Sequence, residues 1–235
     1  MQDADPRLSK VLLAHAAVGA ILNLADSTRT AGPRRAAALF ALGVGLPAVG
    51  EVLATSPLGL LRHRTRPRVA GVPIAVVLGW YCAIRGSYAV AGRALARLPL
   101  SESARGRALL PAAALVGASL DLVLDPVGLD AGLWEWRGDS AYAREVRGAN
   151  GRRGVPLVNY AGWLALVAGV VHAYGRTFGG EAGEGSGAGR LPALLLLPPY
   201  LAAAAWAVRR RRFRYLIYSA PFPAALAASL VDPNR

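Results

Sequence analysis

Long apolar segments alternate with short polar ones along most of the chain. Each segment is close to the length of about 20 residues that an α-helix needs to cross a bilayer core of about 30 Å. The seven segments cover residues 8–25, 36–54, 72–92, 108–125, 155–174, 191–208 and 213–231. The sequence lacks the short alternating segments of a membrane β-barrel. The pattern therefore predicts an all-α, polytopic membrane protein with about seven transmembrane helices.

The composition supports this prediction. The mean hydropathy is +0.35, and 17% of the residues are charged, against about 25% in ordinary soluble domains. The single cysteine, Cys82, excludes an internal disulfide. A cleavable signal peptide is not expected, because charged residues precede the first apolar segment and no small-residue cleavage site follows it. We expect one transmembrane domain over residues 1–235, with a flexible linker at about 179–189.

The net charge of +13 comes mainly from arginines in the loops between apolar segments. No nucleic-acid recognition motif accompanies them, so we expect membrane lipid and not nucleic acid as their partner. The N-terminus and the loops after the second, fourth and sixth segments carry 16 lysines and arginines, against 10 on the other side. This bias predicts a multi-pass protein of the cell membrane with a cytoplasmic N-terminus.

Four polar side chains are expected near this cytoplasmic face. Asp121 and Asp125 end the fourth segment on one helical face, Glu51 lies near the end of the second, and Asn159 lies early in the fifth. Ionisable groups in or near the membrane are functional candidates. Two close carboxyl groups in a low-dielectric site share a proton, and the protonated one can act as a general acid. Asp125 could equally be solvated at the head-group level or paired with a loop arginine, whereas Asp121 lies one turn deeper.

Other side chains are candidates for contacting a substrate. Arg85 lies well inside the third segment, and we expect it to pair with a carboxylate of a neighbouring helix within the same polar cluster. Asn159 could bind substrate or only hold helices together. The aromatic candidates either anchor the protein at the membrane interface or line a cation-stabilising pocket; they are Trp80, Trp134, Trp136, Tyr160 and Trp163. The histidines have no metal-binding spacing, and we assign His63 to a basic loop and expect no metal.

Two similar stretches suggest an internal repeat. G-V-P-I-A-V-V-L-G-W at 71–80 and G-V-P-L-V-N-Y-A-G-W at 154–163 share Gly, Val, Pro, Gly and Trp and lie 83 residues apart. Each follows a segment that ends in an acid. A parallel repeat of this kind predicts a site between the two halves. The alternative is a favourable helix start, with proline at the first helical position and tryptophan as an interface anchor.

Several motifs carry a resemblance to a known family. L-D-P at 124–126, G-x-W-x-W at 132–136 and G-V-P-x-x-N-x-x-G-W at 154–163 resemble the CruF-type carotenoid-biosynthesis membrane proteins. These are carotenoid hydratases of the bacterioruberin and related acyclic-carotenoid pathways. The stretch from Glu51 through T-S-P-L-G at 55–59 to G-V-P at 71–73 and Trp80 is also similar. The likeness covers roughly residues 45–175.

The resemblance implies that water is added to the terminal C=C bond of a lipophilic carotenoid, without a cofactor, to give a tertiary alcohol. Other membrane enzymes of the same pathway are conceivable partners. Our own hypothesis is that Asp121 or Asp125 protonates the alkene and that a second carboxylate, such as Glu51, takes the proton of the water. Tryptophan faces would stabilise the cation, and Asn159 would hold the water.

Two other functions compete with this one. D-x-x-x-D at 121–125 is also typical of a Mg²⁺-dependent membrane prenyltransferase acting on a polyprenyl diphosphate, but the sequence has no second Asp-rich cluster in a comparable loop. A non-enzymatic carotenoid- or lipid-binding membrane protein would also suit the repeat and the glycine-rich second segment. Dependence on Mg²⁺ would indicate the prenyltransferase, whereas an increase in carotenoid mass by one water would indicate the hydratase. An unchanged carotenoid mass would indicate the binding protein.

Overall fold

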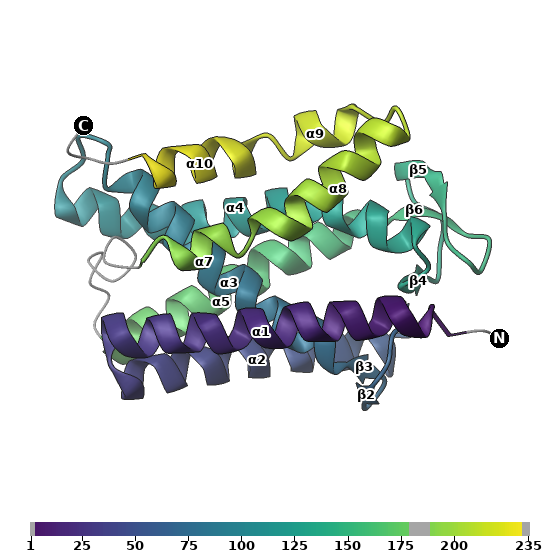
Figure 1. Cartoon of the computed structure of the whole chain (residues 1–235), viewed down its shortest axis with the longest axis horizontal. Coiled ribbons are helices and arrows are strands. Elements are labelled where there is room, and N and C mark those ends of the chain that lie inside the picture. The colour runs from purple at the N-terminus through teal and green to yellow at the C-terminus, as the bar shows by residue number, and fades with distance from the viewer. Residues whose placement is uncertain (1–2, 179–188, 232–235) are drawn as a thin grey trace.

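The computed structural model describes residues 3–178 and 189–231 and shows long α-helices packed side by side (Figure 1). The expected linker at 179–189 lies outside the described residues except for Gly189. The long helices are α1 (Pro6–Ala31), α2 (Pro33–Thr55), α3 (Ile74–Leu95), α4 (Glu102–Asp130) and α5 (Leu157–Phe178). Four shorter helices follow: α7 (Leu191–Leu194), α8 (Leu197–Arg209), α9 (Arg214–Tyr218) and α10 (Pro221–Leu230).

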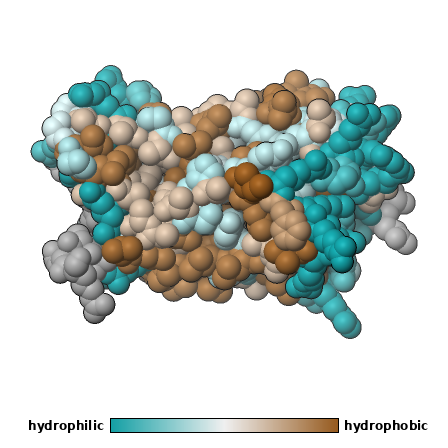
Figure 2. Space-filling view, turned by 90° about the horizontal axis from the view of Figure 1, so that it is seen from above, coloured by the Kyte–Doolittle hydropathy of each residue, from teal (hydrophilic) through white to brown (hydrophobic). Residues whose placement is uncertain are grey.

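The described residues include six helical segments that are long and apolar enough to cross a membrane, with α7 and α8 together forming the sixth. Figure 2 shows hydrophobic side chains across the middle of the molecule and hydrophilic side chains gathered toward its ends, most densely at the right-hand end. Such a belt matches an apolar bilayer core between two polar interfaces. The prediction of a polytopic helical membrane protein is confirmed.

The seventh expected span is wrong as a single helix. Residues 213–231 form α9 and α10, separated at Ser219 and Ala220. Pro221 begins α10, and because proline has no backbone N–H, the helical hydrogen bond to the carbonyl four residues earlier, that of Ile217, cannot form. The ten residues of α10 span about 15 Å, half of a bilayer core. Residues 3–178 and 189–231 therefore contain six membrane-length segments, and two short helices follow the sixth.

Helices α3 and α4 occupy the centre of the bundle. In the most apolar 18-residue stretch of each of these two helices, 61% is buried inside the protein, against 28% or less in the corresponding stretches of the other four segments. Small residues let the neighbouring helices approach them closely. At Gly86 of α3, an added Cβ would lie 2.6 Å from the side chain of Leu196. The residues that α4 presents to its neighbours are consequently held inside protein and away from lipid.

Short strands gather at the end of the bundle where the N-terminus lies (Figure 1). β1 (Leu61–His63) pairs antiparallel with β4 (Trp134–Trp136). The remaining pairs are β2 (Arg68–Val69) with β3 (Val72–Pro73), and β5 (Tyr142–Arg147) with β6 (Arg153–Val155). The loops after α2 and α4 therefore lie at the same end of the molecule, which we call the strand end.

The internal repeat stays a prediction, and two features of the structure agree with it. Gly71 and Gly154 both have positive φ angles, 83° and 80°, which glycine adopts without strain. Each precedes a proline and then a membrane-length helix. Trp80 and Trp163, which occupy equivalent positions in α3 and α5, stack with ring centroids 3.9 Å apart. Contact between equivalent residues is the arrangement expected at a two-fold axis between the halves. One detail differs from the prediction: Pro73 is the extended N-cap of α3 and not its first helical residue.

Candidate active site

Two buried carboxyl groups and one amide form the centre of the candidate site. Asp121 and Asp125 are 4% and 3% exposed and lie one turn apart on α4. Asn159, in the first turn of α5, donates from Nδ2 to Oδ2 of each aspartate at 2.8 Å. An amide nitrogen carries two hydrogens, so one is available for each carboxyl group. Asp125 is thus bonded to Asn159 rather than to a loop arginine, and the two acids are held in fixed positions.

The helix that carries these acids continues past Pro126 to Asp130, although the apolar segment was expected to end at Asp125. Proline has no backbone N–H and cannot bond the carbonyl four residues earlier, that of Leu122. The hydroxyl of Tyr142, in β5, donates to this carbonyl at 2.6 Å. Burial raises the pKa of the Tyr142 hydroxyl well above its usual value, so it stays a donor. The loop after α4 is therefore hydrogen-bonded to the helix at Leu122, the residue directly after Asp121.

The tryptophans of β4 cover the acids from the strand end. The ring of Trp134 packs against Gly128 of α4 so closely that no Cβ would fit there. The indole N–H groups of Trp134 and Trp136 both lie near the Asp125 carboxyl group, yet neither forms a hydrogen bond of normal geometry. The buried hydroxyl of Tyr160 also interacts electrostatically with both aspartates and has no hydrogen-bond partner among the described residues. Three donors are thus available to a polar atom beside the acids.

Glu51 joins the site from the other half of the repeat. Its Oε1 accepts a hydrogen bond of 2.8 Å from Trp80 Nε1, and its Oε2 lies 2.8 Å from His63 Nε2. Glu51 interacts electrostatically with both aspartates. Trp80 also stacks on Trp163 of α5. The Glu51 carboxyl group on α2 therefore lies close enough to the two acids of α4 to act on them electrostatically.

Arg85 pairs with a carboxylate of a neighbouring helix, as expected, but this ion pair is separate from the acid cluster, and that part of the expectation needs correction. Its guanidinium donates from Nη2 to Asp26 Oδ2 at 3.1 Å and from Nε to Ser27 Oγ at 2.8 Å. Arg85 and Asp26 are each 3% exposed. The pair connects α3 to α1. The first segment was expected to end at residue 25, so Asp26 fell outside it, whereas α1 continues to Ala31.

Two residues of the site were missed in the sequence. His63 was assigned to the basic loop, but it is 3% exposed and lies against Glu51. Its neighbours Arg62 and Arg64 make this stretch look like an exposed basic loop in the sequence. The ring is buried in the structure, where β1 pairs with β4. Tyr142 carries no sequence signal, because its role follows from the carbonyl that Pro126 leaves free.

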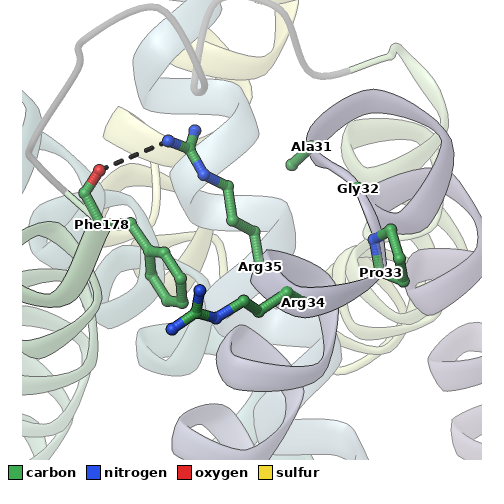
Figure 3. A pocket seen from close by; sticks show the side chains of 6 residues that line it. All are labelled: Ala31, Gly32, Pro33, Arg34, Arg35 and Phe178. Atoms are coloured by element: carbon green, nitrogen blue, oxygen red, sulfur yellow. Dashed lines mark hydrogen bonds between the residues drawn. The ribbon is translucent and has the colours of Figure 1, made fainter.

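A shallow pocket lies at the opposite end of the bundle (Figure 3). It is lined by the turn between α1 and α2 and by the end of α5: Ala31, Gly32, Pro33, Arg34, Arg35 and Phe178. Arg35 Nη2 donates to the carbonyl of Phe178 at 3.4 Å, and the guanidinium lies 5.8 Å from the centre of that ring. This pocket is near the start of α2, whereas Glu51 is near its end, so it is separate from the acids.

The fold is that of a polytopic helical membrane protein, and the buried acids Asp121 and Asp125 form a polar cluster inside its helical bundle. A family model described as carotenoid biosynthesis protein matches residues 8–220. The chain therefore belongs to the carotenoid biosynthesis protein family. The match extends beyond residues 45–175 in both directions. Its role is in carotenoid biosynthesis, and the family implies a lipophilic carotenoid as substrate. No curated protein and no solved structure matches the chain.

Proposed function

We propose that this protein is a carotenoid hydratase of the CruF type, which adds water to the terminal C=C bond of an acyclic carotenoid in a bacterioruberin-like pathway. The observation that supports this most directly is the buried pair Asp121 and Asp125, bridged by Asn159 and placed with Glu51 among aromatic rings. Acid and base are both present, and hydration transfers no electrons.

The aspartate pair is the proposed proton donor. Removing two neighbouring carboxylates from water is costly because each loses its hydration and they repel each other. A shared proton relieves both costs, and the single amide of Asn159 then suffices for the remaining charge. We assign the proton first to Asp121, which would give it to the terminal alkene carbon. A positioned acid of this kind contributes about 10²–10⁴-fold to a rate.

Protonation of the terminal C=C bond gives a tertiary carbocation. Trp80, which stacks on Trp163, donates to Glu51, and Trp134 lies beside Asp125. Aromatic faces attract a cation, by up to about 2 kcal/mol or more when both are desolvated. The rings therefore suit a site that stabilises the cation and limits the access of other nucleophiles.

Glu51 is the proposed base. Trp80 donates to one of its oxygens, and His63 contacts the other, an environment that suits a carboxylate anion. A water molecule adds through its oxygen to the tertiary carbon, and its surplus proton goes to Glu51. The unpartnered N–H and O–H groups of Trp134, Trp136 and Tyr160 suit an oxygen atom at this position. One proton leaves the aspartate pair and one arrives at Glu51, so the sum of the reaction is the addition of one water.

The site lies toward the strand end, where hydrophilic side chains gather, and the apolar belt between the two ends suits a long polyene (Figure 2). We propose that this end faces the cytoplasm of the cell membrane, because the N-terminus and the loops on its side carry more lysine and arginine.

Pigment analysis tests the proposal. Cells that make an acyclic carotenoid would be compared with and without the gene, and the carotenoids analysed by mass. The proposed hydratase increases the carotenoid mass by one water for each modified end. An unchanged carotenoid mass would overturn the proposal and favour a binding protein. Chain transfer that needs Mg²⁺ would favour a prenyltransferase; against this, Asn159 presents a nitrogen donor to the oxygens that Mg²⁺ would have to take.

A further inference from the structure

The pocket at the end of the bundle opposite the acids brings two arginines together. It has a volume of about 370 Å³ and lies between the α1–α2 turn and the end of α5. Arg34 and Arg35 are consecutive residues in the first turn of α2, and both guanidinium groups point toward Phe178 (Figure 3). The turn itself leaves space, because a Cβ added to Gly32 would meet no atom within 4 Å. Two positive groups thus face one open hollow.

Arg35 is fixed in position by the end of α5. Its Nη2 donates to the carbonyl of Phe178 at 3.4 Å, and its guanidinium lies 5.8 Å from the centre of that ring. The side chain of Arg34 is exposed. A guanidinium group that is already positioned loses less side-chain freedom when a ligand binds. The pair therefore combines one fixed and one adaptable donor group.

The positive charge of this pocket is not balanced nearby. No acidic side chain is among the residues that line it. Asp26 is the one acid in the last two turns of α1, and it is buried and bonded to Arg29 and Arg85. Neighbouring guanidinium groups repel each other, and the helix dipole at the start of α2 adds to the positive potential. A bound anion would offset both.

The pocket lies at the depth of lipid head groups. α1, α2 and α5 are each long and apolar enough to cross a membrane, and the pocket is found where α1 and α5 end and α2 begins. Arginine presents a planar fork of donors that matches phosphate oxygens. Basic pockets between transmembrane helices bind the head groups of anionic lipids. A lipid, unlike a soluble phosphate, also has acyl chains that suit the adjoining apolar belt (Figure 2).

We propose that this pocket binds the phosphate group of an anionic phospholipid, with Arg34 and Arg35 as its donors. The acyl chains of the lipid lie along the apolar surface of the neighbouring helices. The bound head group holds the α1–α2 turn against the end of α5 and so stabilises the bundle at this end. The site is separate from the proposed hydration, and its test needs no carotenoid.

The test compares Arg34→Gln, Arg35→Gln and the control Arg176→Gln, each of which removes one positive charge at the same end. Arg176 is exposed in the last turn of α5 and does not line the pocket. The full chain would be placed in bilayer discs of phosphatidylcholine, with and without phosphatidylglycerol. Native mass spectrometry measures the phosphatidylglycerol that stays bound, and thermal unfolding measures its effect on stability.

We expect the wild type to retain phosphatidylglycerol in preference to phosphatidylcholine and to unfold at a higher temperature when it is present. Loss of a hydrogen bond to a charged group should lower this affinity about 10- to 100-fold in Arg34→Gln and in Arg35→Gln. Both variants should lose the rise in unfolding temperature, while in phosphatidylcholine alone Arg34→Gln unfolds as the wild type does. The control should match the wild type in both measurements.

Three results would overturn the proposal. Unchanged binding in Arg34→Gln and Arg35→Gln would show that the lipid does not occupy the pocket. An equal loss in all three variants would show a diffuse attraction of the membrane to a positive end. If inorganic phosphate stabilises the wild type in phosphatidylcholine as much as phosphatidylglycerol does, the pocket binds a soluble anion instead. Should Arg35→Gln not fold, Arg34→Gln decides alone, because its side chain is exposed.

Discussion

Replacing Asp121 by asparagine is the sharpest test of the acid. The substitution changes one oxygen into an amide nitrogen and keeps the shape of a side chain that is 4% exposed in α4. The oxygen of the new amide can still accept the hydrogen bond from Asn159. One of two repelling carboxyl groups becomes neutral, so we expect the variant to fold and to be at least as stable as the wild type.

The effect on the rate should be large. An amide is not a usable acid, and loss of a general acid removes about 10²–10⁴-fold. This corresponds to about 2.8–5.6 kcal/mol in the barrier, at about 1.4 kcal/mol for each factor of ten. The rate of hydration of a carotenoid by the protein in liposomes, followed by product mass, measures it. Thermal unfolding in the same membranes shows whether the fold is kept.

Asp130→Asn is the matched control. It makes the same chemical change on the same helix, but the Asp130 carboxylate is bonded to Trp206 Nε1 at 2.8 Å and to Arg210 at 3.1 Å, outside the acid cluster. The control should keep the wild-type rate. A folded Asp121→Asn protein that hydrates its substrate as fast as the wild type would refute the assignment of Asp121 as the acid.

Three further substitutions test the surroundings of the site. Trp80→Phe keeps an aromatic ring but removes the N–H group that donates to Glu51. Because the loss of a hydrogen bond to a charged group costs about 1.5–3 kcal/mol, turnover should fall about 10- to 100-fold. An unchanged turnover rate would contradict this prediction. Asp26→Asn leaves the guanidinium of Arg85 buried without its carboxylate and should cost about 3–5 kcal/mol in the free energy of unfolding, without changing the turnover of the folded fraction. Gly128→Ala places a methyl group inside the facing indole ring, so tryptophan fluorescence should shift and stability fall by about 1–3 kcal/mol; an unaltered spectrum would show that the ring does not pack there.

The hydropathy pattern alone predicts most of the membrane-length helices. A helix in lipid must satisfy its own backbone, so each crossing appears as an apolar run of nearly constant length. The run at 213–231 shows where this fails, because the total hydropathy does not register the break before Pro221. The expectation at Pro126 failed in the opposite way, because a helix end was expected there and α4 continues to Asp130. Tyr142 donates a hydrogen bond to the carbonyl that the proline leaves without a partner.

The candidate site could be predicted only in part, for a similar reason. The chemical types and the spacing of Asp121 and Asp125 are properties of one helix, and they could be read from the sequence. Asn159 lies 38 residues from Asp121, and its contact depends on how α5 is rotated and shifted against α4. The same holds for His63 on Glu51 and for Arg85, whose partner is on α1. The sequence by itself determined which residues are costly to bury in a membrane. Only the packing of the helices decided which of them meet, because periodicity reports the surroundings of one segment and says nothing of its register with the next.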